Sequence, residues 1–259
     1  MRLREKVAFI TGGSRGIGRA IAVAYARESA TVALMARSSE ALREVERAAA
    51  DAGGTAISFT GDVTAHEDVA LALEETSRRF GHIDVLVNNA GCVEVAPFLE
   101  MSDEAWQRML EVNVLGVVRC SREVIRHMAP RKSGHIINIS SVAGRLAPRF
   151  MSSYATSKAA VIALTRAMAA EFTEHGIAVN AINPGMVETD LADDISNGLG
   201  GCLGKAPEDV RQALVGAMPL GRFLTPEEIA DAAVWLATMR SPLSYTGQCI
   251  DINGGRLFV

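Results

Sequence analysis

The sequence predicts an α/β protein with a single doubly wound, Rossmann-type domain, in which helices cover both faces of a mostly parallel, seven-stranded sheet. Short apolar runs alternate with longer segments of helical periodicity along the whole chain of 259 residues, which is typical of a parallel sheet. A glycine-rich turn follows the first apolar run. No linker, internal repeat or low-complexity stretch divides the chain, so we expect one domain over residues 1–259.

Apolar runs and turn residues mark the expected elements in order. Gly53 and Gly54 stop the second helix, Thr64 and Glu67 have capping-box spacing for the third, and Thr225 precedes a proline and a capping-box glutamate in the last. The expected strands are 7–10, 31–36, 56–60, 85–87, 135–140, 177–182 and 248–252. The expected helices are 19–29, 39–52, 64–80, 103–129, 151–170 and 225–238.

Composition argues against several function classes. The net charge of −4 and the lack of a Lys/Arg block give no sign of a nucleic-acid or membrane surface. No apolar run approaches the roughly 20 residues that span a bilayer, and the N-terminus does not resemble a secretory signal. The four cysteines are scattered and do not cluster with histidines, so we expect reduced thiols, a cytoplasmic location and no metal.

The first strand leads into a glycine turn suited to a pyrophosphate. Gly12, Gly16 and Gly18 allow close backbone approach, and the following helix offers unpaired N–H groups and a positive dipole end. The second strand ends at Arg37, where an acid would favour NAD, and the first acid is Glu40. Arg37 with Arg15 could hold a 2′-phosphate, so we favour NADP(H) over NAD(H). The alternative is that Arg37 is a solvated loop residue.

A second candidate site lies after the fifth strand. Tyr154 and Lys158 fall four residues apart on one expected helix, with Cβ atoms about 5–6 Å apart. A cation that close could lower the pKa of the phenol by about 1–3 units. Ser141 follows an apolar strand, and its hydroxyl is expected at the carboxyl edge of the sheet, where such folds bind ligands. Without context, a surface Tyr–Lys pair is the alternative.

Two further features are ambiguous by themselves. Asn113 falls inside an expected helix, where asparagine is locally unfavourable and is often only exposed or associated with a kink. Residues 186–221 contain several glycines and two prolines with weak periodicity, which suits a mobile lid over a site.

Together these motifs resemble the short-chain dehydrogenase/reductase family over nearly the whole chain. The resemblance rests on seven sets of residues in the family's order and spacing: Thr11–Gly18, Asp62-Val63, Asn88–Gly91, Asn113, Ser141, Tyr154 with Lys158, and Pro184-Gly185 with Thr189. It implies an enzyme in which Tyr154 donates a proton to a carbonyl, Ser141 binds the carbonyl oxygen, and Lys158 binds the nicotinamide ribose and tunes Tyr154. It also implies that Asn113 holds a water in a proton relay.

The resemblance further implies the residues that bind the cofactor. The glycine turn would hold the pyrophosphate and adenosine ribose, two residues would border the adenine, and two later turns would line the trough and hold the nicotinamide. With the pair after the second strand, these residues are Gly12, Ser14, Arg15, Gly16, Ile17, Gly18, Arg37, Ser38, Asp62, Val63, Asn89, Ala90, Gly91, Tyr154, Lys158, Pro184, Gly185, Val187 and Thr189.

Within the family, the sequence is most similar to 3-oxoacyl-(acyl carrier protein) reductases, which implies NADPH-dependent reduction of a ketone. Those enzymes dock an acidic carrier protein through basic residues. Arg131 or Lys132 could serve here, but the second position is His175, and Asn253 stands where aspartate is usual. A free small carbonyl substrate therefore stays open beside the carrier-bound thioester.

Two other functions are weighed against the reductase. They are an NAD(P)-dependent dehydrogenase that oxidises a secondary alcohol, sugar or steroid, and a non-catalytic cofactor-binding scaffold. The family also implies a homotetramer built on helices 103–129 and 151–175, with Ala159, Ala163 and Ala167 allowing close contact or packing on the sheet. We expect substrate identity to depend on residues 93–98, 145–151 and 186–221. Arg145 and Arg149 are candidates for binding an anionic substrate group, and the alternative is that they are solvated loop residues.

Overall fold

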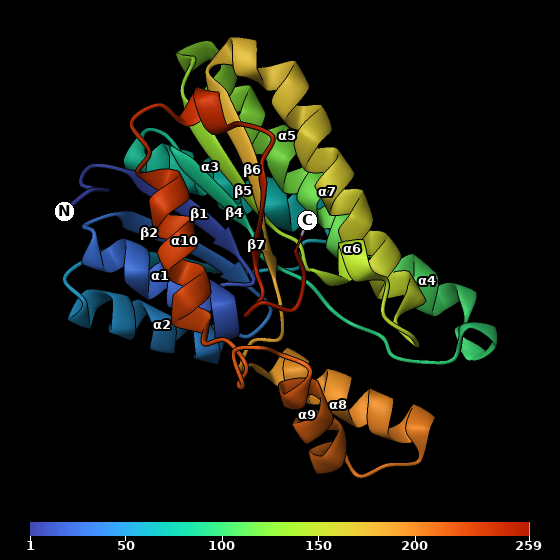
Figure 1. Cartoon of the computed structure of the whole chain (residues 1–259). Helices are drawn as coiled ribbons and strands as arrows, with labels where there is room; N and C mark the ends of the chain where they lie inside the picture. The colour runs from blue at the N-terminus through green and yellow to red at the C-terminus, as the bar shows by residue number, and fades with distance from the viewer. Residues whose placement is uncertain (259) are drawn as a thin grey trace.

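Seven parallel strands form the sheet of the computed structural model, which describes residues 1–258 (Figure 1). Their order is β3-β2-β1-β4-β5-β6-β7. The chain adds strands on one side of β1 as far as β3, then crosses back to place β4 on the other side of β1 and continues outward to β7. Open α/β sheets bind ligands at such a reversal, at the carboxyl ends of the strands. The strands are β1 (Val7–Thr11), β2 (Thr31–Ala36), β3 (Thr55–Thr60), β4 (Val85–Asn88), β5 (Gly134–Ile139), β6 (Ile177–Pro184) and β7 (Cys249–Ile252). The predicted fold class is confirmed.

The central strands are apolar on both faces because each face packs against a layer of helices. In β1, Ala8 and Ile10 belong to the core that contains α1, α2 and α10, whereas Val7 and Phe9 belong to the core that contains α3, α5 and α7. Successive side chains of a strand point to opposite faces, so a strand buried on both sides is a continuous apolar run. This is why the runs were recognisable in the sequence.

Ten α-helices lie within residues 1–258, and none of them combines the length and apolar character needed to cross a membrane. They are α1 (Gly16–Arg27), α2 (Ser39–Asp51), α3 (His66–Phe80), α4 (Asp103–Leu110), α5 (Gly116–Met128), α6 (Ala143–Leu146), α7 (Ser152–Phe172), α8 (Asp190–Leu203), α9 (Pro207–Gly216) and α10 (Pro226–Ala237). Short 3₁₀ turns occupy Phe98–Glu100, Ala129–Arg131, Thr173–His175 and Pro242–Tyr245.

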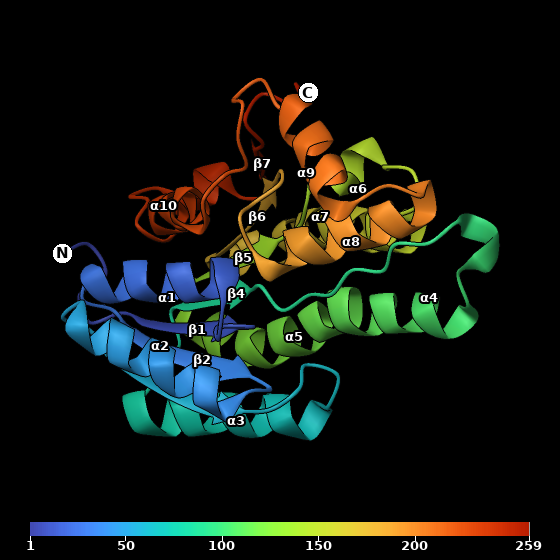
Figure 2. The same cartoon turned by 90° about the horizontal axis from the view of Figure 1, so that it is seen from below.

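The long helix predicted for residues 103–129 is interrupted. A π-helical turn, Glu111–Leu115, joins α4 to α5, and the three pieces form one nearly continuous rod (Figure 2). A π turn inserts an extra residue into the helical repeat and often occurs at functional sites.

The two capping-box predictions have opposite outcomes. At α10 the Thr225 hydroxyl accepts from the Glu228 N–H at 3.3 Å, and the Glu228 carboxylate accepts from the Thr225 N–H at 2.8 Å, as predicted. At α3 the prediction is wrong, because the helix begins at His66 and its N-cap makes no side-chain bond. The Thr64 hydroxyl instead donates to Asp62 at 2.9 Å.

Residues 186–221 hold two helices, α8 and α9, which lie beyond the end of β6 in Figure 1. The weak periodicity was misleading because glycines serve as contact points inside α8. A Cβ on Gly198 would lie 2.6 Å from Val95, and one on Gly200 would lie 2.8 Å from the Lys205 carbonyl. We call residues 188–223 the cap segment; its mobility stays a prediction.

Candidate active site

One cavity of about 1030 Å³ gathers nearly all of the predicted site residues at the carboxyl ends of the strands. Gly18 and Asn113 are the two predicted residues that do not line it. The predicted residues on its wall are Gly12, Ser14, Arg15, Gly16, Ile17, Arg37, Ser38, Asp62, Val63, Asn89, Ala90, Gly91, Ser141, Tyr154, Lys158, Pro184, Gly185, Val187 and Thr189.

The glycine turn between β1 and α1 has the backbone and the donors that a pyrophosphate needs. Gly12 and Gly16 have φ values of +63° and +53°, a region that side chains disfavour. The N-cap residue Arg15 makes no side-chain capping bond, and the first turn of α1 carries no acid. The N-terminal N–H groups of α1 are therefore left for a ligand, so this turn fits the phosphates of a dinucleotide.

Gly18 contributes by packing, because its backbone lies against the turn itself. An added Cβ would overlap the Gly12 carbonyl and would lie 2.5 Å from the Asn89 amide nitrogen. That amide donates to the carbonyls of Thr11, at 3.0 Å, and Gly12, at 2.9 Å. The Asn89 side chain thereby ties the turn after β4 to the turn after β1.

Ser141, Tyr154 and Lys158 come together on the other wall of the cavity. Ser141 follows β5, while Tyr154 and Lys158 lie on α7 and are each only 5% exposed. The Lys158 ammonium lies 5.8 Å from the centre of the Tyr154 ring and donates to the Ile139 carbonyl at 2.9 Å. The Ser141 oxygen accepts from the Ala143 N–H at 3.1 Å, which leaves the Ser141 proton available for another acceptor.

Burial dominates the electrostatics of this group. It raises the pKa of Tyr154 to about 12, against the opposing effect of a hydrogen bond from Ser141, and lowers the pKa of Lys158 to about 8. The expected lowering of the Tyr154 pKa by Lys158 is therefore wrong for this structure. Desolvation disfavours both charged forms and is the largest influence on each of the two pKa values. The phenol consequently holds its proton at neutral pH.

Asn113 is neither exposed nor on the cavity wall. It lies in the π-helical turn and is 1% exposed. Its amide nitrogen donates to the Ser157 hydroxyl at 2.9 Å and to the Cys92 carbonyl at 3.0 Å, and its oxygen accepts from the Cys92 N–H at 2.9 Å. A Cβ on Gly91 would lie 3.3 Å from the Asn113 oxygen and 3.5 Å from the Lys158 ammonium, so Asn113 lies directly behind the Gly91 turn.

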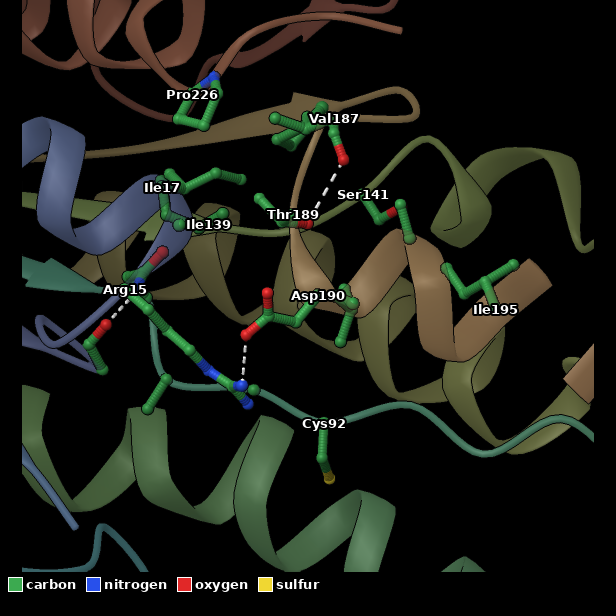
Figure 3. A pocket seen from close by; sticks show the side chains of 18 of the residues that line it. Arg15, Ile17, Cys92, Ile139, Ser141, Val187, Thr189, Asp190, Ile195 and Pro226 are labelled. Carbon is green, nitrogen blue, oxygen red and sulfur yellow. Dashed lines mark hydrogen bonds and ion pairs between the residues drawn. The ribbon is translucent and has the colours of Figure 1, made fainter. Parts of the chain in front are cut away.

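The sequence did not reveal the ion pair of Arg15. Its guanidinium pairs with Asp190 at the start of α8, as Figure 3 shows. The two residues are 175 positions apart in the sequence, so local patterns could not indicate the contact. The pair connects the glycine turn to the cap segment.

One part of the cavity wall is apolar. Met151, which precedes α7, and Tyr154 within it cluster with Ile195 from α8, and Met186, Leu199 and Leu214 pack against them. Leu146, Pro148 and the cap segment line the cavity as expected, whereas residues 93–98 do not reach its wall. Other wall residues that the sequence did not single out include Cys92, Arg108, Glu188, Glu227 and Arg256.

Arg145 and Arg149 do not face a substrate. Arg145 lies 3.4 Å from Asp251 and donates to the Cys249 carbonyl at 3.1 Å, so it is directed to β7. Arg149 lies over the Phe150 ring, 4.4 Å from its centre. Neither arginine lines the cavity, so the expectation that they read an anionic group is wrong.

The basic residues considered for carrier docking lie at the other edge of the sheet. Arg131 pairs with Asp84 at 3.2 Å and donates to the Ile83 carbonyl at 3.2 Å, so a structural contact occupies it. The turns that carry Lys132 and His175 precede β5 and β6. The amino ends of these strands are opposite the edge that carries the cavity.

Comparisons with known proteins agree with this geometry. A family model described as short chain dehydrogenase matches residues 6–199. The 3-oxoacyl-(acyl-carrier-protein) reductase FabG of Thermotoga maritima is 37% identical over 98% of this chain and 99% of its own length. A solved NAD+-bound xylitol dehydrogenase matches with TM-score 0.94 and 32% identity, covering 98% of this chain and 100% of its own. A solved actinorhodin polyketide ketoreductase with NADPH matches with TM-score 0.93 and 32% identity, covering 97% of each chain.

Proposed function

The chain belongs to the short-chain dehydrogenase family, and on that basis we propose that it is an NADPH-dependent reductase that converts a ketone into a secondary alcohol. The observation that carries the proposal is the single cavity that joins an uncapped helix N-terminus to Ser141, Tyr154 and Lys158. One end suits a dinucleotide, and the other provides a hydrogen-bond donor, a proton donor and a cation beside an apolar chamber.

The bound cofactor would supply the hydride, and the protein would orient both reactants and provide the proton. The glycine turn would hold the pyrophosphate, while Pro184, Gly185, Val187 and Thr189 would border the nicotinamide end. The Ser141 hydroxyl would donate to the carbonyl oxygen, where negative charge develops. Tyr154 would then transfer its phenolic proton to that oxygen.

Lys158 and Asn113 would support this proton transfer, the first by its charge and the second by holding neighbouring groups in position. The Lys158 cation would stabilise the phenolate that Tyr154 leaves after giving up its proton. Asn113 holds the Cys92 backbone and Ser157, and so fixes the loop and helix on either side of Lys158. We propose that it acts on the proton relay by holding these groups in place.

Tyr154 holds the proton that reduction consumes. With a pKa raised to about 12, the phenol is protonated at neutral pH. Proton transfer leaves a buried phenolate, and the Lys158 cation would offset the cost of that charge.

The key test compares ketone reduction with NADPH by the wild type and by Tyr154→Phe, which keeps the ring but lacks the proton. We expect kcat to fall by at least about 100-fold, because general acid catalysis contributes about 10²- to 10⁴-fold. Tyr245→Phe, at an exposed tyrosine outside the cavity, is the control and should retain full activity. Equal rates for wild type and Tyr154→Phe would refute the mechanism.

The preference for NADPH rests on the cavity wall after β2. Arg37 and Ser38 line the wall, and Ser38 caps α2 by accepting from the Ala41 N–H at 3.3 Å. We expect the wild type to bind NADPH more tightly than NADH. Arg37→Ala should weaken NADPH binding about 10- to 100-fold and leave NADH unchanged, since a charge-assisted bond to the 2′-phosphate is lost. Arg47→Ala, on the exposed side of α2, is the matched control. Tighter binding of NADH by the wild type would contradict the assignment.

The oxidative alternative draws support from the similarity to an NAD+-bound xylitol dehydrogenase. Activity with NAD+ and a polyol, in the absence of ketone reduction with NADPH, would favour it. A carrier-bound 3-oxoacyl thioester stays open beside a free ketone as the substrate, because Arg131 is already paired whereas Lys132 is exposed.

We also propose a homotetramer that uses α7. Ala159, Ala163 and Ala167 are exposed, so this small-residue face does not pack on the sheet. Light scattering of the purified protein tests it, and a monomer would contradict it.

A further inference from the structure

The last residues described form a turn that Asn253 holds in place. Its amide nitrogen donates to the Leu257 carbonyl at 2.9 Å, and its oxygen accepts from the N–H groups of Gly255, at 2.9 Å, and Leu257, at 3.4 Å. Gly254 and Gly255 have φ values of +63° and +84°, which give the chain its tight reversal. An amide supplies both a donor and acceptors, whereas an ionised aspartate could only accept. Asn253 therefore fixes the position of Arg256.

The Asn253 turn contacts the chain at two places: just before the cap segment begins and near the end of that segment. The Gly185 N–H donates to the Ile252 carbonyl at 2.8 Å, and a Cβ on Gly185 would lie 3.0 Å from Asn253. On the other side, the Leu220 N–H donates to the Gly254 carbonyl at 3.0 Å. Arg256 thus joins the cavity wall from a turn that lies close to both ends of the cap segment.

Arg256 is a cation on this wall for which residues 1–258 provide no partner. It is half-buried, and its side chain makes no hydrogen bond or ion pair with the other residues in 1–258. Two acids that line the cavity are already paired, Glu188 with Arg211 and Asp190 with Arg15. Glu227 is at the start of α10 and also lines a hollow between α1 and α10. Arg256 is therefore a half-buried cation on the wall of the cavity that also contains the apolar cluster around Tyr154.

We propose that Arg256 determines substrate specificity by pairing with an anionic group of the ketone, and that this group is a carboxylate. The proposal rests on the proposed function, because it places the ketone carbonyl at Tyr154 and the carboxylate at the far end of the apolar chamber. A guanidinium binds a carboxylate through two parallel N–H bonds, which gives orientation as well as affinity. The apolar side chains between the two ends would contact the carbon chain of an oxo acid.

The test uses ketones in matched pairs. The 3-oxo, 4-oxo and 5-oxo carboxylates of six carbons are compared with their methyl esters, each with NADPH, for the wild type, Arg256→Gln and Arg256→Lys. We expect the wild type to prefer at least one carboxylate over its ester. Arg256→Gln should lower kcat/KM for that carboxylate by about 10- to 100-fold and change the ester by less than about twofold, because only the charged pair is lost. Arg256→Lys should recover part of the loss, since it restores the charge without the planar fork.

A control variant and a second substrate pair separate the alternatives. Arg240→Gln removes an exposed arginine outside the cavity and should behave as the wild type with both members of each pair. Equal losses for carboxylate and ester in Arg256→Gln would show a structural role and overturn the proposal, as would a wild type without any preference. The second pair is 3-oxohexanoyl-CoA and the N-acetylcysteamine thioester of the same 3-oxohexanoyl group. If the wild type prefers the CoA thioester and Arg256→Gln abolishes that preference, the anion is a phosphate and the carboxylate assignment is overturned.

These results also distinguish the two proposals. Reduction of the esters without a preference for carboxylates leaves the proposed function intact and refutes the role of Arg256. Failure to reduce any ketone with NADPH refutes the proposed function itself.

Discussion

Lys158 should lower the free energy of unfolding of the unliganded protein, although its charge is proposed to serve catalysis. The variant Lys158→Met tests this. Burial lowers the pKa of Lys158 from its ordinary value of 10.5 to about 8. At about 1.4 kcal/mol per pKa unit, keeping the ammonium charged at neutral pH costs about 3 kcal/mol. Methionine has a similar length and no charge. Its introduction also removes the hydrogen bond to the Ile139 carbonyl, at a cost of about 1 kcal/mol.

The expected net effect at pH 7 is a gain of about 2 kcal/mol in the free energy of unfolding. For a protein of this size that corresponds to a rise in Tm of about 4–8 °C. Activity should fall by at least about 100-fold, since the cation beside Tyr154 is lost. Urea denaturation followed by circular dichroism measures the stability, and NADPH oxidation measures the activity.

The pH dependence gives the sharper test because it is independent of the lost hydrogen bond. Between pH 8 and 10.5 the unfolded chain binds a proton at Lys158 that the folded protein has released, so the wild type gains stability as pH rises through this window. The stability difference between Lys158→Met and the wild type should therefore change by roughly 2.5 kcal/mol between pH 7 and pH 10, from a gain of about 2 kcal/mol to a loss of about 0.5 kcal/mol. Lys205→Met, at an exposed lysine, is the control for the loss of a surface charge. A stability difference that does not change with pH would refute the reasoning, as would a variant that is less stable than the wild type at pH 7.

Three further predictions follow from named contacts. Gly18→Ala should lower stability by about 1–3 kcal/mol and weaken NADPH binding, because the new methyl group would overlap the Gly12 carbonyl; an unchanged Tm would contradict this. In reduction assays, kcat/KM should be level below about pH 8 and fall above it as Lys158 loses its proton, and a profile still level at pH 9.5 would argue against that assignment. Thr225→Ala should lower the free energy of unfolding by about 1 kcal/mol through loss of the α10 capping box, with kcat unchanged; if urea denaturation shows no loss, the cap does not stabilise the fold.

The fold and the cavity residues could be predicted from the sequence because the patterns that indicate them are local. Strands buried on both faces are apolar runs, and the turns after them carry glycine, serine or asparagine in a fixed order. The position of Asn113 could not be predicted, because its partners Cys92 and Ser157 belong to other parts of the chain and the π turn has no local sequence pattern. The helix α8 was missed because Gly198 and Gly200 lower helix propensity, while the contacts that explain them involve Val95 and Lys205.

Electrostatic details were the least predictable. The distance between Tyr154 and Lys158 along a helix suggested attraction, but the depth of burial determines the sign of the pKa shift, and burial is a property of the whole fold. Arg256 gave no signal at all, since a cation three residues after Asn253 becomes informative only when the turn between them is known.

The pairing of Val187 with Leu224 makes the cap segment a closed excursion from the sheet. The Glu188 N–H donates to the Leu224 carbonyl at 2.8 Å, and the Leu224 N–H donates to the Met186 carbonyl at 2.9 Å. These bonds fasten the two ends of the excursion to each other, so the closure does not depend on the residues between them. Exchanging the cap segment alone should therefore be a way to adapt such a protein to other substrates.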